Sequence, residues 1–572
     1  VTSIAYGQRI GDSKLVLGKT YTVNELKAVN GFIRCVSTEN ERKLQAKYPE
    51  RMTDAEFEAW LAPLVEKSRE SKSQNGGIIT IPVVVHVIHA GQAYGTAPNI
   101  TDTQVQSQIT VMNNDYRKLA GTSGFNSNPV GADVMIQFAL AKVDPNGNPT
   151  NGIDRVNLCK AFWTTDEVDA TVKPQTIWDP TQYMNMWSVQ LGGASANILG
   201  YAQFPSNPGI VGVPAGGAAN TDGVVANYAT FGSSDYDDGS FSLDAPYDKG
   251  RTMTHEVGHF LGLRHIWGDD DNTDPSGLSC ATDFCNDTPP AHKANGGCTV
   301  PIASCTAGLF EMVENYMDYT NDTCMNIFTL DQKARMTAIM NNSPRRLELK
   351  TSTKDISIPL FANDGELKAE KNCNVATVCG GTTTIPFPFS LYNRGTAQLT
   401  SAVITYTING GATQTYNWTG NLGQNRYAVI SFTAPESSTI SAQITSVNGT
   451  SDARASNNTA IASAGGFTTI PMAGSTAVTF TLIYLVHRWL FCPRSASMRS
   501  YLSPCRSCCV HCQRPAPPVA GDSIHHEKLS VTRAGAGGRA PHGPPGRPNW
   551  PLVRAVGPAR ARCGARSAAG RS

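Results

Sequence analysis

Three histidines and one glutamate have the spacing of a metal-dependent hydrolase. His255 and His259 are four residues apart, so on a helix both imidazoles face the same side and can reach one cation. Glu256 lies between them, where its carboxylate can take a proton from zinc-activated water and pass it to a leaving amine. Gly262 permits a left-handed residue that ends the helix and lets the chain bring in His265. Three neutral histidines leave a fourth position for water, which predicts a catalytic zinc site.

A second short motif lies downstream. Met317 follows His265 by 52 residues, and Tyr319 lies two residues after Met317. A methionine beneath a zinc site packs a flexible, polarisable apolar side chain against the ligands, and Tyr319 can turn toward the metal. Alone, a Tyr-Met pair is typical of ordinary core, and the histidines of an amphipathic helix can be incidental. Together the two motifs favour the metal site.

The elements that must position these residues form an α+β pattern between residues 78 and 350. Residues 78–88 are almost all β-branched, as expected of a strand buried on both faces. Helical spacing follows at 101–118 and returns at 251–262. Residues 267–325 have little regular pattern and need disulfides or bound ions to be ordered. Further strands are predicted at 134–143, 153–157 and 224–228, and a closing helix at 326–348.

The N-terminal 77 residues divide into three parts. Residues 1–8 resemble the end of a signal peptide, although an ordinary N-terminus fits them equally well. Residues 9–77 are polar and mostly helical, with a capping box of Thr53 and Glu56. Residues 66–77 are charged and end in glycines, which predicts an exposed linker open to proteases.

The C-terminal third contains two unlike segments. Residues 365–470 alternate Thr, Val, Tyr and Ile between turns, which predicts an immunoglobulin-like β-sandwich, and Cys373 could pair locally with Cys379. Residues 484–572 have 14 Lys and Arg against 2 Asp and Glu and no periodicity, which suggests out-of-frame or disordered sequence. The alternative is a Cys/His metal module, formed by Cys505, Cys508, Cys509, His511 and Cys512.

Charge and cysteine content limit the function classes. The net charge is +1, which suggests no nucleic-acid or membrane partner, and no segment reaches transmembrane length. Of 15 cysteines, five crowd into residues 280–324, which points to an oxidising, extracytoplasmic compartment. We therefore expect a secreted protein.

The two motifs together identify a family. HExxHxxGxxH followed by a Met-turn is the metzincin signature. Residues 280–290, of sequence CATDFCNDTPP, together with NYMDY at 315–319, resemble the pappalysin family, in particular its bacterial cytophagalysin and ulilysin-like branch. The resemblance runs from about residue 33 to 348 and is strongest at 255–265, 283–290 and 315–336.

The resemblance implies roles for further residues. Tyr319 would stabilise the tetrahedral intermediate. Hard oxygen ligands in the family's calcium region correspond to Asp283, Asn286 (through its carbonyl) and Thr288. Two disulfides are implied, Cys280 with Cys305 and Cys298 with Cys324. Cys285 departs from the family's usual apolar residue, and Cys159 is a possible partner for it.

Two more residues bear on regulation and specificity. Asp322 matches an acidic residue at the base of the S1′ pocket, where a buried carboxylate would favour Arg or Lys at P1′; a solvated loop aspartate is the alternative. Cys35 resembles the family's pro-segment cysteine, whose thiolate can take the fourth zinc position; a disulfide or inert cysteine is the alternative. The Ser68–Arg69 and Ser71–Lys72 bonds would then be sites of self-cleavage.

The sequence as a whole predicts a latent zinc endopeptidase. Its substrates would be proteins or peptides, and the β-sandwich would bind a surface or a substrate. A rival within catalysis is a metzincin that prefers apolar P1′ residues. A rival of another class is a zinc-stabilised adhesin that has lost catalysis, against which the presence of Glu256 argues.

Overall fold

The computed structural model describes residues 14–21, 31–70, 77–206, 219–269, 280–298, 301–373 and 384–463. The predictions for residues 1–8, for 484–572 with its Cys/His module, and for Cys379 lie outside these residues. Within them, no helix has the length and hydropathy to cross a membrane.

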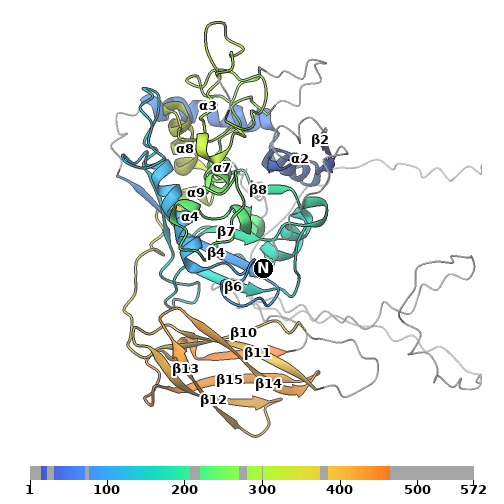
Figure 1. The fold of residues 1–572 in the computed structure, drawn as a ribbon, viewed down its shortest axis with the longest axis vertical. Coiled ribbons are helices and arrows are strands. Elements are labelled where there is room, and N and C mark those ends of the chain that lie inside the picture. The colour runs from blue at the N-terminus through green and yellow to red at the C-terminus, as the bar shows by residue number, and fades with distance from the viewer. Residues whose placement is uncertain are drawn as a thin grey trace, which may run out of the picture. The chain divides into compact units, whose positions relative to one another are not determined.

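A seven-stranded sheet forms the frame of the larger domain (Figure 1). Strand β4 (Ile79–His89) lies at its centre and pairs in parallel with β5 (Ile136–Leu140), β6 (Ile153–Asn157) and β7 (Met184–Val189). The prediction of a strand buried on both faces is confirmed, because the side chains from Ile81 to His89 are buried.

The other edge of this sheet reverses direction. Strand β9 (Val224–Asn227) is parallel to β7, whereas β8 (Ile198–Ala202) is antiparallel to β9. The edge is completed by β3 (Ile33–Cys35), which comes from the N-terminal segment and pairs in parallel with β8. The N-terminal segment therefore adds a strand to the seven-stranded sheet.

Two helices pack together against the sheet. Helix α4 (Asp102–Tyr116) begins at Thr101, whose side chain accepts a hydrogen bond from Gln104 N. Helix α7 (Arg251–Phe260) contacts both α4 and strand β8. Their apolar side chains, including Met112 and Val257, share one core with the sheet. Both helices were predicted, and α7 ends two residues earlier than expected.

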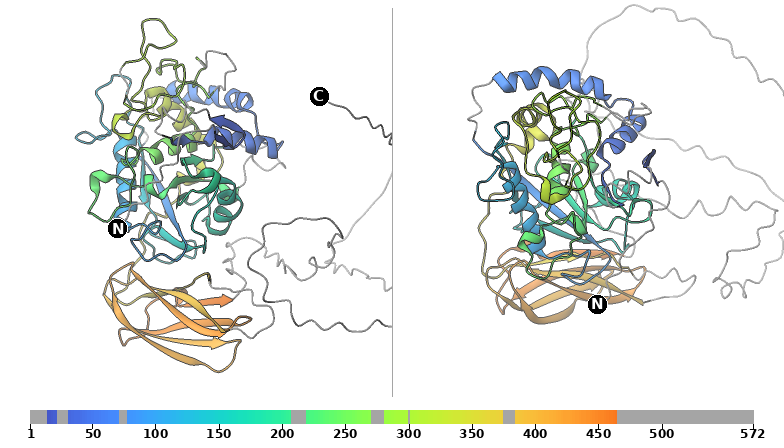
Figure 2. Two further views of the ribbon diagram at one scale, coloured as in Figure 1. Left: turned by 45° about the vertical axis from the view of Figure 1, so that its right-hand side comes forward. Right: turned by 45° about the horizontal axis from the view of Figure 1, so that its top comes forward.

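Two N-terminal helices lie against this domain. Helix α2 (Ser37–Lys47) follows strand β3 directly, and α3 (Asp54–Glu70) packs alongside α8 (Leu330–Asn342), as Figures 1 and 2 show. The capping box is confirmed, because Glu56 Oε2 accepts from Thr53 N and Glu56 N donates to Thr53 Oγ1. The linker prediction was wrong for residues 66–70, which continue α3.

The remaining elements of this part of the chain are short. Within the predicted irregular segment, the described residues contain only one 3-10 turn, which begins at Asp322. This turn is η7 (Asp322–Cys324), and the other short elements are β1 (Lys14–Val16), β2 (Lys19–Tyr21), α5 (Thr165–Glu167), η2 (Val168–Val172), α6 (Lys173–Thr176), η3 (Gly193–Ser195), η4 (Ala219–Thr221), η5 (Tyr228–Thr230), η6 (Ser234–Tyr236) and α9 (Arg346–Leu349).

Residues 365–463 form two antiparallel sheets around a second core. One sheet has the order β10-β11-β14 and the other β13-β12-β15-β16, and Phe389 and Ile404 meet between them. Asn409 and Gly410 both have positive φ, as a type I′ hairpin turn requires. The elements are β10 (Gly365–Ala369), β11 (Thr384–Asn393), β12 (Leu399–Ile408), β13 (Gln414–Leu422), β14 (Tyr427–Pro435), β15 (Thr439–Val447), η8 (Ala455–Asn457) and β16 (Thr459–Ser463).

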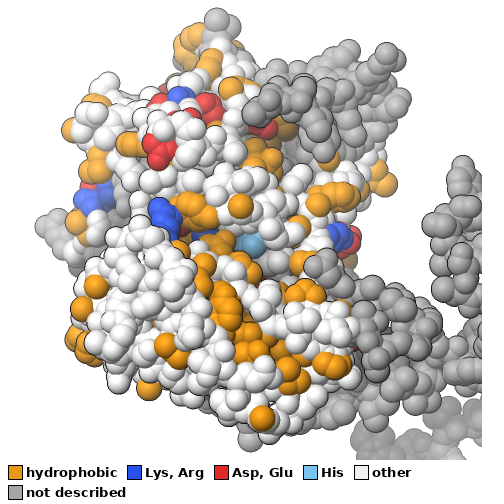
Figure 3. Space-filling model, turned by 60° about the horizontal axis from the view of Figure 1, so that its bottom comes forward, with side chains coloured by type: hydrophobic (Ala, Val, Ile, Leu, Met, Phe, Trp, Pro, Cys, Tyr) orange, Lys and Arg blue, Asp and Glu red, His pale blue; other side chains and the backbone are white. Residues whose placement is uncertain are grey.

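The larger of these two sheets carries no charge. Strands β12, β13, β15 and β16 contain no Lys, Arg, Asp or Glu and are rich in Thr and Ser. On the face drawn in Figure 3, uncharged surface predominates, and most of the acidic side chains lie near its upper part.

Candidate metal centre and active site

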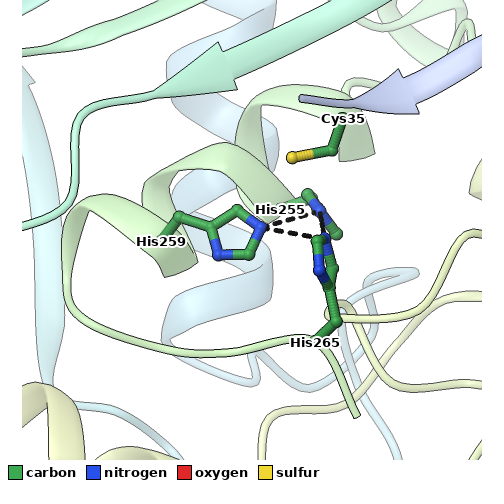
Figure 4. Close-up of side chains that lie close together, drawn as sticks. All are labelled: Cys35, His255, His259 and His265. Carbon is green, nitrogen blue, oxygen red and sulfur yellow. Dashed lines mark hydrogen bonds between the residues drawn. The ribbon is translucent and has the colours of Figure 1, made fainter. Parts of the chain in front are cut away.

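The three histidines converge as their spacing predicted (Figure 4). Helix α7 places His255 and His259 one turn apart, and both are fully buried. Gly262 has φ +89° and reverses the chain so that His265 returns to them. The Nε2 atoms lie 3.2 Å apart for His255 and His259, 3.2 Å for His255 and His265, and 3.0 Å for His259 and His265.

The far side of each ring has a hydrogen-bond acceptor. Nδ1 of His255 donates to Tyr316 O at 2.7 Å, and Nδ1 of His259 donates to Leu263 O at 2.8 Å. Nδ1 of His265 is bonded to the carboxylate of Asp269. These acceptors fix the tautomer and leave each Nε2 lone pair free for a metal. Asp269 was not predicted, although its place four residues after His265 is the available signal.

Burial keeps His255 and His259 neutral. Desolvation, followed by the neighbouring imidazoles, lowers the pKa of His255 far below its ordinary value and that of His259 to about 3. A tetrahedral zinc ion with ordinary Zn–N bonds requires nitrogen atoms about 3.3 Å apart, close to the spacing observed. The three residues therefore fit a zinc ion.

Cys35 faces the same point from strand β3. Its Sγ and the three imidazoles have ligand atoms that all lie within 4.8 Å of one another, and all four residues are buried. Figure 4 shows the sulfur directed toward the histidines. Burial and the neighbouring Glu256 carboxylate raise the pKa of the Cys35 thiol, an effect that a dication at the histidines would oppose.

Glu256 is buried beside the metal position. Its Oε2 accepts from Ser37 Oγ at 2.7 Å and from Cys35 Sγ at 3.2 Å, while Oε1 has no hydrogen-bond partner among the described groups. Burial raises the pKa of Glu256 to about 8. Ser37 was missed at the sequence level, because a single serine in a polar helix carries no signal.

The Met-turn lies beneath the histidines. Met317 Sδ packs against Gly258 so closely that a Cβ there would collide with it, which explains a glycine between the two helical histidines. The Tyr319 ring meets the rings of His255 and His265 edge-on or tilted, at 5.7 and 4.9 Å. Its hydroxyl donates to Cys35 O at 3.1 Å.

Asp322 is buried and paired with the residue before Cys35. Arg34 Nη2 donates to Asp322 Oδ1 at 2.9 Å, and both side chains are fully buried. Asp322 Oδ2 accepts from the backbone N–H groups of Lys249 and Arg251 at 3.0 and 3.1 Å, so the carboxylate sits at the N-terminus of helix α7. The alternative of a solvated loop aspartate does not fit this geometry.

Three further contacts hold the Arg34 guanidinium in place. Nη1 donates to Thr320 O at 2.8 Å, and Nη2 also contacts Met325 Sδ at 3.3 Å. The guanidinium lies over the ring of Tyr247, 5.2 Å from its centroid. Neither Arg34 nor Tyr247 was identified from sequence as part of this pocket.

Two of the three predicted calcium residues are in direct contact. Asp283 accepts from Thr288 Oγ at 2.7 Å and from Cys285 N at 3.0 Å, and burial raises its pKa to about 7. Asn286 is exposed, and its N–H donates to Asp331. Asp283 and Thr288 are therefore close, and the role of Asn286, which concerns its carbonyl, stays a prediction.

Three disulfides are present among the described cysteines. Cys280–Cys305 and Cys298–Cys324 were expected and are observed. The suggested pairings of Cys285 with Cys159 and of Cys373 with Cys379 were wrong, because Cys159 pairs with Cys373 across 214 residues and Cys285 is a buried free thiol.

One predicted self-cleavage bond is also corrected. Arg69 lies in helix α3, where its guanidinium binds Asp331 and Glu66. A bond inside a packed helix cannot enter an extended active site, so Ser68–Arg69 is not available in this structure. The Ser71–Lys72 bond lies outside the described residues.

A buried three-histidine centre with a glutamate on the same helix and a methionine beneath it defines a zinc-dependent peptidase of the metzincin class. The sequence comparisons agree with this assignment. The family model of peptidase M43, described as pregnancy-associated plasma protein-A, matches residues 166–341. The chain belongs to this family and is a metalloendopeptidase.

Several individual proteins are similar to it. An extracellular metalloprotease of Arthroderma otae is 30% identical over 289 residues, which cover 50% of this chain and 86% of that protein. Extracellular metalloprotease 1 of Coccidioides posadasii is 33% identical over 241 residues, covering 42% and 69%. Mature mirolysin of Tannerella forsythia, solved with a cleaved peptide, is 38% identical, covers 50% of this chain and 100% of its own, and has a TM-score of 0.41. A promirolysin mutant of Tannerella forsythia is 35% identical, covers 57% of this chain and 99% of its own, and has a TM-score of 0.45.

Proposed function

We propose that this chain is a secreted zinc endopeptidase, held latent by its residues 9–77, that cleaves peptide bonds on the N-terminal side of Arg or Lys. One observation carries the proposal. Consecutive residues of the N-terminal segment fill two positions of the active site, with Cys35 at the three histidines and Arg34 on Asp322.

His255, His259 and His265 would hold the metal, and Glu256 would move the proton. When bound, zinc polarises the scissile carbonyl and makes water a stronger nucleophile at neutral pH. Glu256 would accept the proton of the attacking water at its carboxylate and transfer it to the leaving amine. Glu256 lies on the same helix as two of the histidines, between His255 and His259 in sequence, which suits a group that passes a proton between water and the leaving amine.

Tyr319 would stabilise the developing oxyanion. In the latent chain its hydroxyl donates to the carbonyl oxygen of Cys35, which is a peptide carbonyl beside the metal position. The same hydroxyl can donate to the carbonyl oxygen of a substrate, where the bond strengthens as negative charge develops.

Latency would follow from occupation of the site. The Cys35 thiolate would take the position that water needs, and the pairing of β3 with β8 blocks the sheet edge. A carboxylate buried in the Arg34 pocket is incomplete without a cation, so after release of the segment Asp322 would select a basic P1′ side chain.

Three disulfides among the described residues and extracellular relatives support secretion. Asp283 and Thr288 would bind a structural calcium ion. The two sheets of residues 365–463 have the size and antiparallel pairing of an immunoglobulin-like sandwich, which would bind a surface or a substrate.

The test is self-activation of the purified full chain, followed by mass spectrometry, with Glu256→Ala as the control. We expect the wild type to lose its N-terminal segment by a cut at Ser71–Lys72 and then to cleave a peptide library before Arg and Lys. The Glu256→Ala chain should stay intact and retain zinc.

Two results would decide for the rivals. Cleavage without enrichment of Arg or Lys at P1′ would favour a metzincin with apolar preference. No hydrolysis by the processed, zinc-loaded wild type would favour the adhesin.

A further inference from the structure

Two buried arginines of the catalytic domain hold one carboxylate of the N-terminal segment. Glu58 of helix α3 accepts from Arg335 Nη1 at 2.6 Å and Nη2 at 2.5 Å, and from Arg264 Nε at 3.2 Å. The side chains of all three residues are at most 8% exposed. The contact is a bidentate fork with a second arginine beside it, the geometry by which proteins recognise carboxylates.

Contacts within the catalytic domain hold the two guanidinium groups in place. Arg335 projects from helix α8, donates from Nε to Gly262 O at 2.6 Å and lies over the ring of Phe284. Arg264 lies over the ring of Phe204, 5.1 Å from its centroid. None of these contacts involves the N-terminal segment, so the fork does not depend on Glu58 for its shape.

Removal of the N-terminal segment would leave both cations without their carboxylates. Glu58 would depart, and so would Asp54, which pairs with Arg264 at 3.1 Å. The nearby Asp269 is already bonded to His265. The two guanidinium groups are at most 4% exposed while helix α3 covers them. Once it leaves, they keep the neighbouring charges of Asp269 and Asp283, but the fork that held Glu58 is open to another carboxylate.

We propose that Arg264 and Arg335 form a carboxylate-binding site in the processed enzyme, which takes an acidic side chain of a peptide. This rests on the proposed removal of the N-terminal segment. Arg264 lies in the loop that carries His265, and Arg335 donates to Gly262 O of the same loop, so the site is attached to the segment that supplies the third metal ligand. Two peptides offer this chemistry: the released segment returning in trans, and a substrate with an acidic residue away from the scissile bond.

The binding test does not require hydrolysis. The Glu256→Ala chain is cut in residues 71–76 with trypsin, separated from its N-terminal segment, and titrated with a fluorescent peptide of residues 54–70. We expect the Glu58→Gln peptide to bind about 30-fold more weakly or worse, because a buried charge pair loses one partner. The Glu66→Gln peptide is the matched control, since Glu66 is mostly exposed on the same helix, and should bind like the wild type.

Variants of the protein complete the test. Arg335→Gln should abolish the difference in affinity between the wild-type and Glu58→Gln peptides, and Arg335→Lys should restore part of it. Sodium acetate should compete with the wild-type peptide better than sodium chloride at equal ionic strength. Equal binding of the Glu58→Gln and wild-type peptides would overturn the proposal.

The two sources are separated with the active enzyme. If substrates bind through this site, a Glu→Gln change outside P1′ should raise KM in the wild type but not in Arg335→Gln. If only the released segment binds, substrate KM should not respond and the segment should inhibit. Absence of hydrolysis would count against the proposed function and leave the binding result intact.

Discussion

Glu256 is the side chain on which hydrolysis should depend most. Its carboxylate is buried beside the three histidines but is not directed at them through a hydrogen bond; its described partners are Ser37 and Cys35. Glu256→Gln should therefore lower kcat by about 10²–10⁴-fold while leaving the zinc content unchanged. Peptide assays on processed protein, with metal analysis of the same samples, measure both; loss of zinc would mean that Glu256 supports the metal instead.

Asp322 should set specificity without entering the reaction. Removing one partner of a buried ion pair costs about 3–5 kcal/mol, so Asp322→Asn should lower kcat/KM for P1′ Arg peptides by about 10²–10³-fold. Peptides with Leu at P1′ are the control and should change little. An equal loss for both peptides would show that Asp322 acts through the N-terminus of helix α7, which it also contacts.

For individual residues, the sequence predicted the metal ligands better than the side chains that hold the site in place. His255, Glu256 and His259 follow from the period of one helix, and Gly262 explains the return of His265. Ser37 and the Arg34–Asp322 pair depend on contacts that local periodicity does not encode; Arg34 and Asp322 are 288 residues apart. Physical reasoning could identify their chemistry but not their proximity.

Among the elements, the segment around Asp283 should respond to calcium. Burial raises the pKa of Asp283 to about 7, above its unfolded value near 3.9, so its ionisation destabilises the fold as pH rises through this interval. A bound cation offsets that cost only when the carboxylate is ionised. Calcium should therefore raise the unfolding temperature more at pH 8 than at pH 5.5.

Thermal unfolding with calcium or with a calcium chelator measures this effect. Asp283→Asn is the control and should lose most of the calcium response. A response that is the same in the variant, or larger at pH 5.5, would place the ion elsewhere.

Regular elements were easier to predict than this segment. Strand β4 and helices α4 and α7 have clear apolar periods. Asn409 and Gly410 are residue types that adopt the positive φ of a tight turn. Residues 267–325 lack a period, and their order depends on disulfides and on buried polar contacts such as Asp283 with Thr288. The extension of α3 through Arg69 was missed because a partner distant in sequence, Asp331, stabilises a polar helix end.

At the scale of the whole molecule, one disulfide joins the catalytic domain to the β-rich residues. Cys159 follows strand β6, and Cys373 follows β10. After a protease cuts between residues 350 and 364, the two parts should stay together on a non-reducing gel. The Cys159→Ser, Cys373→Ser double variant should release them as separate bands, with peptide hydrolysis unchanged because neither cysteine contacts the metal centre.

The pairing of Cys159 with Cys373 also shows where sequence reasoning ends at this scale. The β-sheets could be predicted from alternation, and their separate core is observed. Nothing local links residues 214 positions apart, and cysteine counts permit many pairings.

In the proposed latent state, strand β3 belongs to the same polypeptide as the site it covers, which has a consequence for concentration. While the chain is intact, tethering presents Arg34 and Cys35 to the site at an effective concentration on the order of millimolar, however dilute the protein is. After cleavage the strand is present only at the concentration of the enzyme itself. Activation should therefore be nearly irreversible in dilute solution and partly self-limiting where the protein accumulates, so dilution after cleavage favours the active enzyme.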